Sequence, residues 1–404
     1  MPIDRRQFLA TAAALAAVPP LRVHGAAADG PLPAGIRMDF PSVERGTYLN
    51  AAAIHPLSAP AARRLQRYID VRLNGVAPEK SESDSDVQDD VKRRFAALIN
   101  ATPREIAFVQ NTSDGENIVV MGLDLGRRGG NVVLDELHFT TSLYMYKTLE
   151  AKGLELRIVK HRDWAIDPRD VARAIDRNTR LVSMALVSNV NGFMHDVRAV
   201  ADAAHAQGTY LYADMVQAVG AVPVDVRAMG IDFAATATYK WLMGERGFGF
   251  LYVREDLQDR VLPTTRYGHR QVASFNRVDL TWEPLPGAAR YETGTFPTAL
   301  AAVSHESLQY IDRLGLTNIQ AHARGLMARL QKELPAMGYP SLTPAGTPTP
   351  IAAFALRDPA ATAKRLRAAN ITATIIEAEK RLRLSVSVFN NDEDIDRLLQ
   401  ALSS

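Results

Sequence analysis

A lysine and an aspartate are the residues of this 404-residue chain whose surroundings best suit them to chemistry. Asp214 ends the apolar run of residues 210–213, which predicts a strand, and ligands of open parallel α/β sheets bind at that edge. Lys240 follows 26 residues later, in the apolar, hydroxyl-rich stretch Thr236-Ala237-Thr238-Tyr239-Lys240-Trp241. Burial there would lower the pKa of the amine and make it nucleophilic. Asp214 could instead cap a helix, and Lys240 could be a surface lysine in a turn.

Three further polar groups follow predicted strands. Asn111-Thr112-Ser113-Asp114-Gly115-Glu116-Asn117 is a small-residue loop that opens a helix, so its amides and hydroxyls suit an anion, although the same residues also make a good N-cap. His138 and the segment Ser188-Asn189-Val190-Asn191-Gly192 follow two other apolar runs. Without the other motifs, His138 could be a structural histidine and Asn189 could simply form a turn.

The chain resembles the class V aminotransferase family, which includes cysteine desulfurases, kynureninases and isopenicillin-N epimerases. The motifs above recur in the family's order, and the resemblance extends over residues 47–402. It implies a pyridoxal 5′-phosphate cofactor and the α/β fold of fold-type I enzymes, with a mostly parallel, seven-stranded sheet and a smaller α+β C-terminal domain. Three more segments carry it: Tyr48-Leu49-Asn50-Ala51-Ala52-Ala53, Tyr291-Glu292-Thr293-Gly294-Thr295, and Arg383-Leu384-Ser385 followed by Phe389-Asn390.

The resemblance implies a role for each matching residue. Lys240 holds the cofactor as a Schiff base, Asp214 pairs with its pyridinium nitrogen, and Gln217 contacts its phenolic oxygen. His138 stacks on the cofactor ring, and Arg383 clamps the substrate carboxylate with its planar guanidinium. Catalytic roles fall to Lys240, Asp214 and His138. The remaining expected contacts are Thr112, Ser113, Asn189, Thr236, Thr238, Tyr239 and Thr295 to the cofactor, and Asn189 and Ala52 to the substrate.

Two features of the resemblance concern the phosphate. Ala237 and Tyr239 stand where the family often has a serine and a histidine, so Thr236, Thr238 and Tyr239 are expected to share the phosphate contacts. Thr295 matches a threonine that reaches the phosphate of the neighbouring subunit in relatives. The resemblance therefore implies a homodimer with shared active sites.

The N-terminus predicts a twin-arginine signal peptide over residues 1–28. Asp4-Arg5-Arg6-Gln7-Phe8-Leu9 precedes a weakly apolar stretch at residues 10–18, and Ala26-Ala27-Ala28 offers a cleavage site. The apolar stretch is shorter than the roughly 18–20 residues of a membrane span. We expect the twin-arginine machinery to export the chain to the periplasm. The alternative is an alanine-rich extension with a chance pair of arginines.

Composition and periodicity set the remaining expectations. The net charge of +2 indicates no nucleic-acid partner, and the absence of cysteine excludes disulfides and thiolate metal sites. No zinc-binding His-Glu-x-x-His or other metal motif occurs, so we expect no metal. Short apolar runs alternate with amphipathic helices up to about residue 300. We divide the mature chain into residues 29–55, contributing to the active site, 56–300, binding the cofactor, and 301–404, forming the small domain.

The expected function is chemistry at Cα of an amino acid, or of an amino-bearing exported metabolite or peptide. Transamination, epimerisation of the isopenicillin-N type, elimination by a lyase, and oxidative tailoring of a siderophore or peptide all stay open. A non-enzymatic binding protein is a further alternative. Because a sulfur-mobilising desulfurase needs a nucleophilic cysteine, the sequence predicts that the chain is not a desulfurase of this kind.

Overall fold

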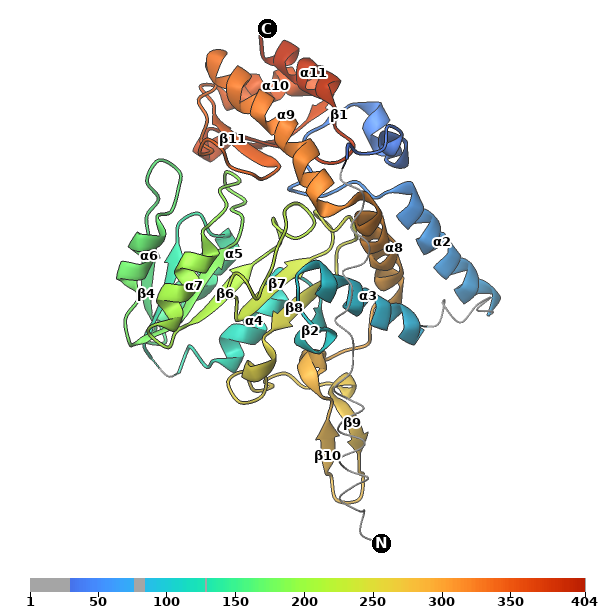
Figure 1. Ribbon diagram of the computed structural model, residues 1–404, viewed down its shortest axis with the longest axis vertical. Coiled ribbons are helices and arrows are strands. Elements are labelled where there is room, and N and C mark those ends of the chain that lie inside the picture. The colour runs from blue at the N-terminus through green and yellow to red at the C-terminus, as the bar shows by residue number, and fades with distance from the viewer. Residues whose placement is uncertain (1–29, 76–83, 128, 404) are drawn as a thin grey trace.

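Residues 30–75, 84–127 and 129–403 are described by the computed structural model. The predicted signal peptide lies outside them. Figure 1 shows a small lobe with the C-terminus at the top, a larger α/β body below it, and a projecting hairpin at the bottom. The N-terminal segment around β1 (Thr47–Tyr48) lies beside the small lobe, although the residues of that lobe come much later in the sequence.

Seven strands form the central sheet of the body, in the order β2-β8-β7-β6-β5-β3-β4. Only β8 runs antiparallel to its neighbours, so the sheet is mostly parallel, as predicted. Most of its strands are buried along their whole length, which explains their continuous apolar runs. The strands are β2 (Ile106–Val109), β3 (Asn131–Asp135), β4 (Glu155–Val159), β5 (Thr179–Ala185), β6 (Tyr210–Asp214), β7 (Phe233–Ala237) and β8 (Gly249–Val253).

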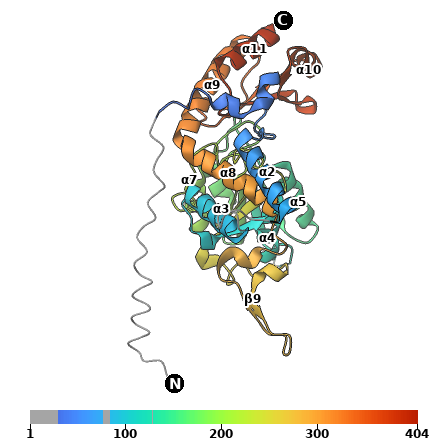
Figure 2. The same ribbon diagram turned by 90° about the vertical axis from the view of Figure 1, so that its right-hand side faces the viewer.

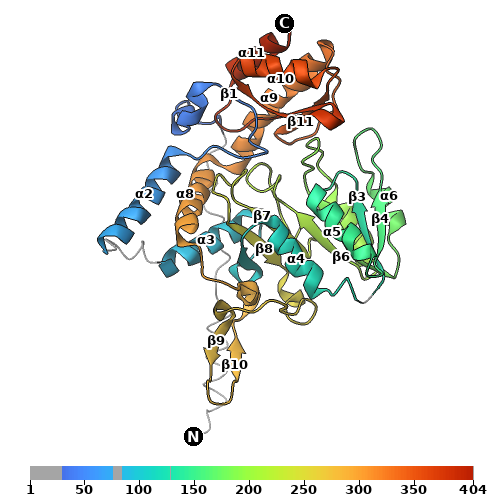
Figure 3. The ribbon, with the colours of Figure 1, turned by 180° about the vertical axis from the view of Figure 1, so that it is seen from behind.

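Helices cover both faces of this sheet, and each face has its own apolar cluster. On one face lie α3 (Asp84–Leu98), α6 (Pro168–Ala174), α7 (Val197–His205) and α8 (Thr298–Leu314), with Phe95 of α3 stacked 3.8 Å from Phe250 of β8 between ring centroids. On the other face lie α4 (Thr112–Gly122) and α5 (Thr140–Glu150), which Figure 3 shows from behind. Figure 2 shows α2 (Ala59–Asn74) packed along α8.

The small lobe is an antiparallel sheet with helices on one face. Its strand order is β11-β14-β13, and β1 pairs separately with β12 (Ile371–Thr372). Leu382 and Leu384 of β14 point into the apolar cluster under the helices, so Arg383 and Ser385 point to the opposite face. The other elements are β11 (Ile351–Ala355), β13 (Thr374–Ile376), β14 (Arg381–Ser385), α9 (Leu316–Ala336), α10 (Pro359–Ala368) and α11 (Asp392–Ser403).

A two-stranded hairpin, β9 (Val272–Phe275) and β10 (Trp282–Pro284), projects from the body (Figure 1). Its apolar side chains are exposed rather than buried: Phe275, Val278, Leu280 and Trp282. The sequence analysis did not predict this element. None of the helices in the described part of the chain is long and apolar enough to cross a membrane.

Candidate active site

Loops at the carboxyl ends of the parallel strands bring the predicted residues together. Asp214 is the last residue of β6, and Lys240 follows β7 by three residues. His138 follows β3 and Asn189 follows β5. Because parallel strands end at the same edge, the prediction that placed Asp214 at a ligand-binding edge agrees with the architecture.

A tight turn after β7 holds Lys240. The Thr238 hydroxyl donates to the carbonyl oxygen of Glu245 (2.7 Å), and the amide of Met243 donates to the carbonyl oxygen of Lys240 (2.8 Å). The lysine is 7% exposed, and its amine makes no hydrogen bond or ion pair with any described residue. Burial lowers the pKa of Lys240 to about 8, although the negative charge of Asp214 opposes this shift. The neutral, nucleophilic form of the amine is therefore far more abundant near neutral pH than it is for an exposed lysine.

Asp214 is a buried acid opposite this lysine. Its carboxylate accepts a hydrogen bond from the amide of Val216 (2.9 Å), and burial raises its pKa to about 6. A protonated ring nitrogen placed against this carboxylate would favour its ionised form, because an opposite charge offsets the loss of solvation. The site thus offers an uncompensated carboxylate to a cationic ring.

Gln217 joins three parts of the chain around the site. Its amide nitrogen donates to the carbonyl oxygen of Ala52 (3.0 Å), and its oxygen accepts from the indole nitrogen of Trp241 (2.8 Å). The amide of Ala52 donates in turn to the Ser385 hydroxyl (2.8 Å). Gly220 permits this packing, because it has a φ of +91° and a Cβ there would lie 2.3 Å from the carbonyl oxygen of Trp241.

Arg383 lies between the two lobes. Its guanidinium donates to the carbonyl oxygen of Asn189 (2.8 Å) and to the Thr374 hydroxyl (3.3 Å), while its buried Nε has no hydrogen-bond partner among the described residues. No carboxylate in the described chain pairs with it, and burial lowers its pKa to about 10. The Asn189 side-chain oxygen is also buried without a partner in that part of the chain. A carboxylate from a ligand would satisfy the arginine.

The predicted phosphate contacts divide into free and occupied hydroxyls. Thr112 and Ser113 open α4 after the N-cap Asn111, and the buried Thr112 hydroxyl has no partner within the described residues. The Thr238 hydroxyl already donates within the lysine turn, and that of Thr236 makes only a 3.5 Å contact to the carbonyl oxygen of Ala237. A helix N-terminus with a free hydroxyl suits a phosphate. The phosphate roles of Thr236, Thr238 and Tyr239 stay predictions.

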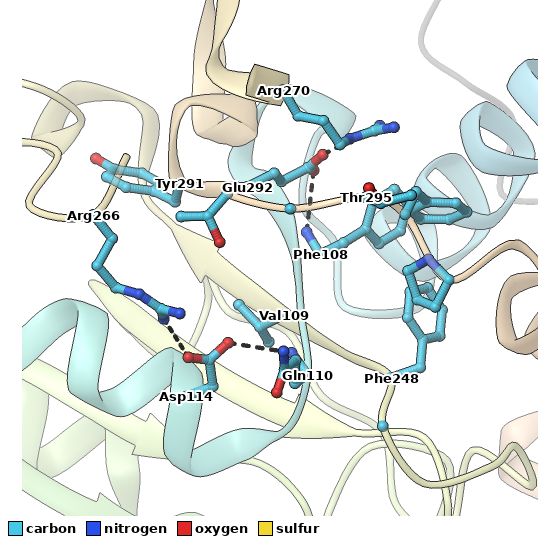
Figure 4. A pocket seen from close by; sticks show the side chains of 15 residues that line it. Phe108, Val109, Gln110, Asp114, Phe248, Arg266, Arg270, Tyr291, Glu292 and Thr295 are labelled. Atoms are coloured by element: carbon cyan, nitrogen blue, oxygen red, sulfur yellow. Dashed lines mark hydrogen bonds and ion pairs between the residues drawn. The ribbon is translucent and has the colours of Figure 1, made fainter. Parts of the chain in front are cut away.

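Thr295 lines a cavity beside the start of α4, and Lys240 is not among the residues that line this cavity. Figure 4 shows it with Asp114, which forms an ion pair with Arg266, and with Glu292, whose carboxylate is 3.7 Å from Arg270. This arrangement leaves Thr295 without a contact to the lysine of its own chain. Its role at the phosphate of a partner subunit stays a prediction.

Two buried polar residues of the site were not assigned roles from the sequence. The amide of His55 donates to the carbonyl oxygen of Tyr239 (3.0 Å), and its ring Nε2 lies 2.8 Å from the Ser387 hydroxyl. Glu116 of α4 reaches under His138, with 4.0 Å between the Glu116 Oε1 and the His138 Nε2. A single histidine or glutamate has no spacing pattern, so only the tertiary fold reveals these neighbours.

The donor set fits pyridoxal 5′-phosphate. The structure provides a buried, unpaired lysine amine, a buried carboxylate, a free hydroxyl at a helix N-terminus, and a buried arginine without a carboxylate. These groups match an aldehyde, a pyridine nitrogen, a phosphate and a substrate carboxylate, respectively. No group of three or more His, Asp or Glu side chains within the described residues is placed to hold a metal ion.

This fold and site define a fold-type I pyridoxal-phosphate enzyme. The chain belongs to the class V aminotransferase family, whose model, described as aminotransferase class-V, matches residues 48–398. Family membership confirms the predicted cofactor. A probable cysteine desulfurase from Methanothermobacter thermautotrophicus is 31% identical over 300 residues, 73% of this chain and 74% of the relative.

Solved structures share the fold. The apo structure of a cysteine desulfurase from Thermococcus onnurineus NA1 superposes with a TM-score of 0.84 at 24% identity, covering 93% of this chain and 98% of the other. The cystine C–S lyase C-DES, in complex with its reaction product cysteine persulfide, gives a TM-score of 0.82 at 18% identity, covering 90% and 99%. At these identities the likeness concerns the fold alone.

The prediction that this chain is not a cysteine desulfurase is wrong. A relative that is 31% identical over nearly three quarters of its length carries that name. The prediction rested on the missing cysteine, whose thiol would attack the substrate sulfur as the carbon–sulfur bond breaks, a part that an external thiol can also play. The groups placed to act at Cα are present regardless, so a missing thiol does not separate this chain from desulfurases.

Proposed function

We propose that the chain is a pyridoxal-phosphate enzyme that acts at Cα of an α-amino acid whose carboxylate Arg383 binds. The observation that carries this proposal is the burial of Arg383 without an acidic partner, close enough to Lys240 for its charge to lower the lysine pKa. A buried arginine with no counter-ion is costly unless a ligand supplies one. An α-amino acid has both an amine for the cofactor and a carboxylate for Arg383.

The residues divide the chemistry among them. Bound pyridoxal phosphate supplies an electron sink for the bonds at Cα. Lys240 would hold the cofactor aldehyde and, as an amine at the same place, would move the Cα proton of the substrate. Asp214 would hold the ring nitrogen in its protonated form, and Arg383 would bind the substrate carboxylate and so orient the substrate at Cα. None of these roles depends on a protein thiol.

Substitution Arg383→Lys tests the substrate proposal. The lysine keeps a positive charge but loses the planar pair of donors, so KM for α-amino acids should rise by about 10- to 100-fold. Amines that lack the carboxylate should be affected less than threefold. The measurement is steady-state kinetics with matched pairs of amino acids and their decarboxylated amines. Equal effects on both members of each pair would contradict carboxylate binding by Arg383.

Cleavage of a carbon–sulfur bond is the reaction that the names of the relatives favour. Cysteine and an external thiol would give alanine and a persulfide of that thiol, which balances because the sulfur passes to the small molecule. The chain has no cysteine to accept it. Product analysis separates the branches: persulfide or sulfide that depends on added thiol supports this reaction, whereas a keto acid without sulfur release, or inverted chirality, supports transamination or epimerisation.

We also propose that the chain acts as a homodimer. The position of Thr295, in a cavity that its own Lys240 does not line, supports a site completed by a second copy, and the exposed apolar hairpin β9–β10 offers contact surface. Sedimentation of the purified protein should give twice the mass of the chain. A monomer at micromolar concentration would overturn this proposal.

Export through the twin-arginine pathway to the periplasm is proposed from the sequence motif Asp4-Arg5-Arg6-Gln7-Phe8-Leu9. The pathway suits a protein that folds and loads its cofactor before it crosses the membrane. Replacing both arginines with lysine should move the protein from the periplasmic to the cytoplasmic fraction. An unchanged distribution after fractionation would contradict the proposal.

A further inference from the structure

Glu116 is a buried acid of the cofactor site for which the proposed chemistry has no role. It lies on the second turn of α4, four residues after Thr112, and is 3% exposed. Its Oε2 accepts from the Ser142 hydroxyl (2.6 Å), and its Oε1 accepts from the Ser183 hydroxyl (3.0 Å). Two serines from different elements, α5 and β5, thus converge on one carboxylate.

The hydrogen bonds run in one direction from His138 to Glu116. The amide of Phe139 donates to Nδ1 of His138 (2.7 Å), so the ring proton lies on Nε2. Nε2 is 3.0 Å from the Ser183 hydroxyl and donates to it, and that hydroxyl donates to Glu116. Burial lowers the pKa of His138 to about 4, which keeps the ring neutral. Glu116 is the final acceptor of this chain.

Among the described residues, no lysine or arginine forms an ion pair with Glu116. The groups that face it are His138, Tyr146, Tyr212 and Asp214, and the Tyr212 hydroxyl is buried without a hydrogen-bond partner in that part of the chain. Burial, and to a lesser extent the charge of Asp214, raise the pKa of Glu116 to about 7. Glu116 therefore changes charge near neutral pH, close to the acid that faces the cofactor ring.

We propose that Glu116 is a positioning residue of the cofactor site. Glu116 fixes the orientation of the His138 ring through Ser183, and its negative charge acts on Asp214 and on the bound cofactor. This inference rests on the proposed function, because it concerns the cofactor that Lys240 binds. The ionised carboxylate accepts both serine hydroxyls at once, which no neutral aliphatic side chain can do. Its charge favours protonation of the cofactor.

Three variants separate position from charge. Glu116→Gln keeps an oxygen acceptor for Ser183 but removes the charge. Glu116→Ala and Ser183→Ala both break the hydrogen-bond chain, and Ser183→Ala leaves the acid in place. Glu105→Gln is the matched control, because Glu105 is equally buried but pairs with Arg227 outside the site. The readouts are the visible circular dichroism of bound pyridoxal phosphate, which reports ring orientation, its dissociation constant, and the pH titration of its absorbance.

We expect Glu116→Gln to keep the dichroism while the midpoint of the absorbance titration falls by about one pH unit, because removal of a negative charge disfavours the protonated cofactor. Glu116→Ala and Ser183→Ala should each lose at least half of the dichroism and bind the cofactor about tenfold more weakly. Glu105→Gln should match the wild type in all three readouts.

Each contrary result has its own meaning. If Ser183→Ala and folded Glu116→Ala retain the wild-type dichroism, the positioning role is overturned. If Glu116→Gln keeps the wild-type midpoint, the charge effect is overturned. Should Glu116→Ala fail to fold, as judged by its thermal transition, Ser183→Ala decides the positioning role alone. A wild-type protein that binds no pyridoxal phosphate would instead overturn the proposed function.

Discussion

Substitution of Lys240 by alanine is expected to lower kcat by at least about 10⁴-fold, because one side chain provides both the covalent link to the cofactor and the base at Cα. The lysine is 7% exposed and its amine is unpaired within the described residues, so no neighbouring group is placed to replace it. Removing a buried, partly charged amine should leave the folded state at least as stable. Steady-state kinetics and a thermal melt measure the two effects.

The control for this substitution is Lys147→Ala. Lys147 lies on α5 with its side chain 69% exposed, so its loss should leave kcat within about twofold of the wild type. Added primary amines should restore part of the activity of Lys240→Ala, because they supply the missing nucleophile. Activity of Lys240→Ala within tenfold of the wild type would rule out the assigned role.

Asparagine in place of Asp214 is expected to reduce kcat by about 10³-fold with a smaller change in KM. The amide preserves the shape of the side chain and the contact to the amide of Val216, but it carries no charge to hold a proton on the ring nitrogen. A neutral ring is a weaker electron sink, so the loss falls on the chemical step rather than on binding. Kinetics at saturating substrate measure this effect directly.

Asp232→Asn is the matched control for Asp214→Asn. Asp232 is a fully buried aspartate that pairs with Arg254 and His205, away from Lys240. Its substitution should lower the melting temperature while kcat per folded molecule stays within about threefold. A loss of kcat equal to that of Asp214→Asn would show that burial, rather than the cofactor contact, explains the effect.

The same two site residues predict how cofactor uptake by the apo-protein depends on pH. Asp214, with a pKa of about 6, becomes ionised as pH rises through 6, and Lys240, with a pKa of about 8, becomes neutral as pH rises through 8. Uptake needs both forms, so its rate should increase between pH 6 and 8. Asp214→Asn should lose the dependence near pH 6 and keep the one from Lys240, moved below pH 8 because the charge of Asp214 no longer raises the lysine pKa.

Local sequence patterns were sufficient to predict the sheet and the main chemical groups. The buried parallel strands appear as apolar runs, and Asp214 and Lys240 lie where strand ends must meet. Strand β14 ends at Ser385, where the amide of Ser385 donates to the carbonyl oxygen of Leu49 and the chain then turns toward Asn390. The periodicity of residues 386–388 gave no sign of this turn.

Other features depend on contacts between distant residues. Gln217 meets Ala52, and Ala52 meets Ser385, across separations of 165 and 333 residues. Glu116 has a role only because Ser142 and Ser183 converge on it in the folded chain. The strands of the hairpin β9–β10 are exposed, so their side chains do not alternate between buried and exposed. The hairpin also has no two-residue turn motif, so neither of the usual sequence signals of a hairpin is present.

The most direct test of the central claim is to find the residue that holds the cofactor. The wild-type protein is incubated with pyridoxal 5′-phosphate, reduced with borohydride and digested, and the modified peptide is identified by mass spectrometry. We predict a single stoichiometric modification on Lys240, which is absent from Lys240→Ala. Modification spread over exposed lysines such as Lys147, or none at stoichiometric cofactor, would contradict the assignment of this site.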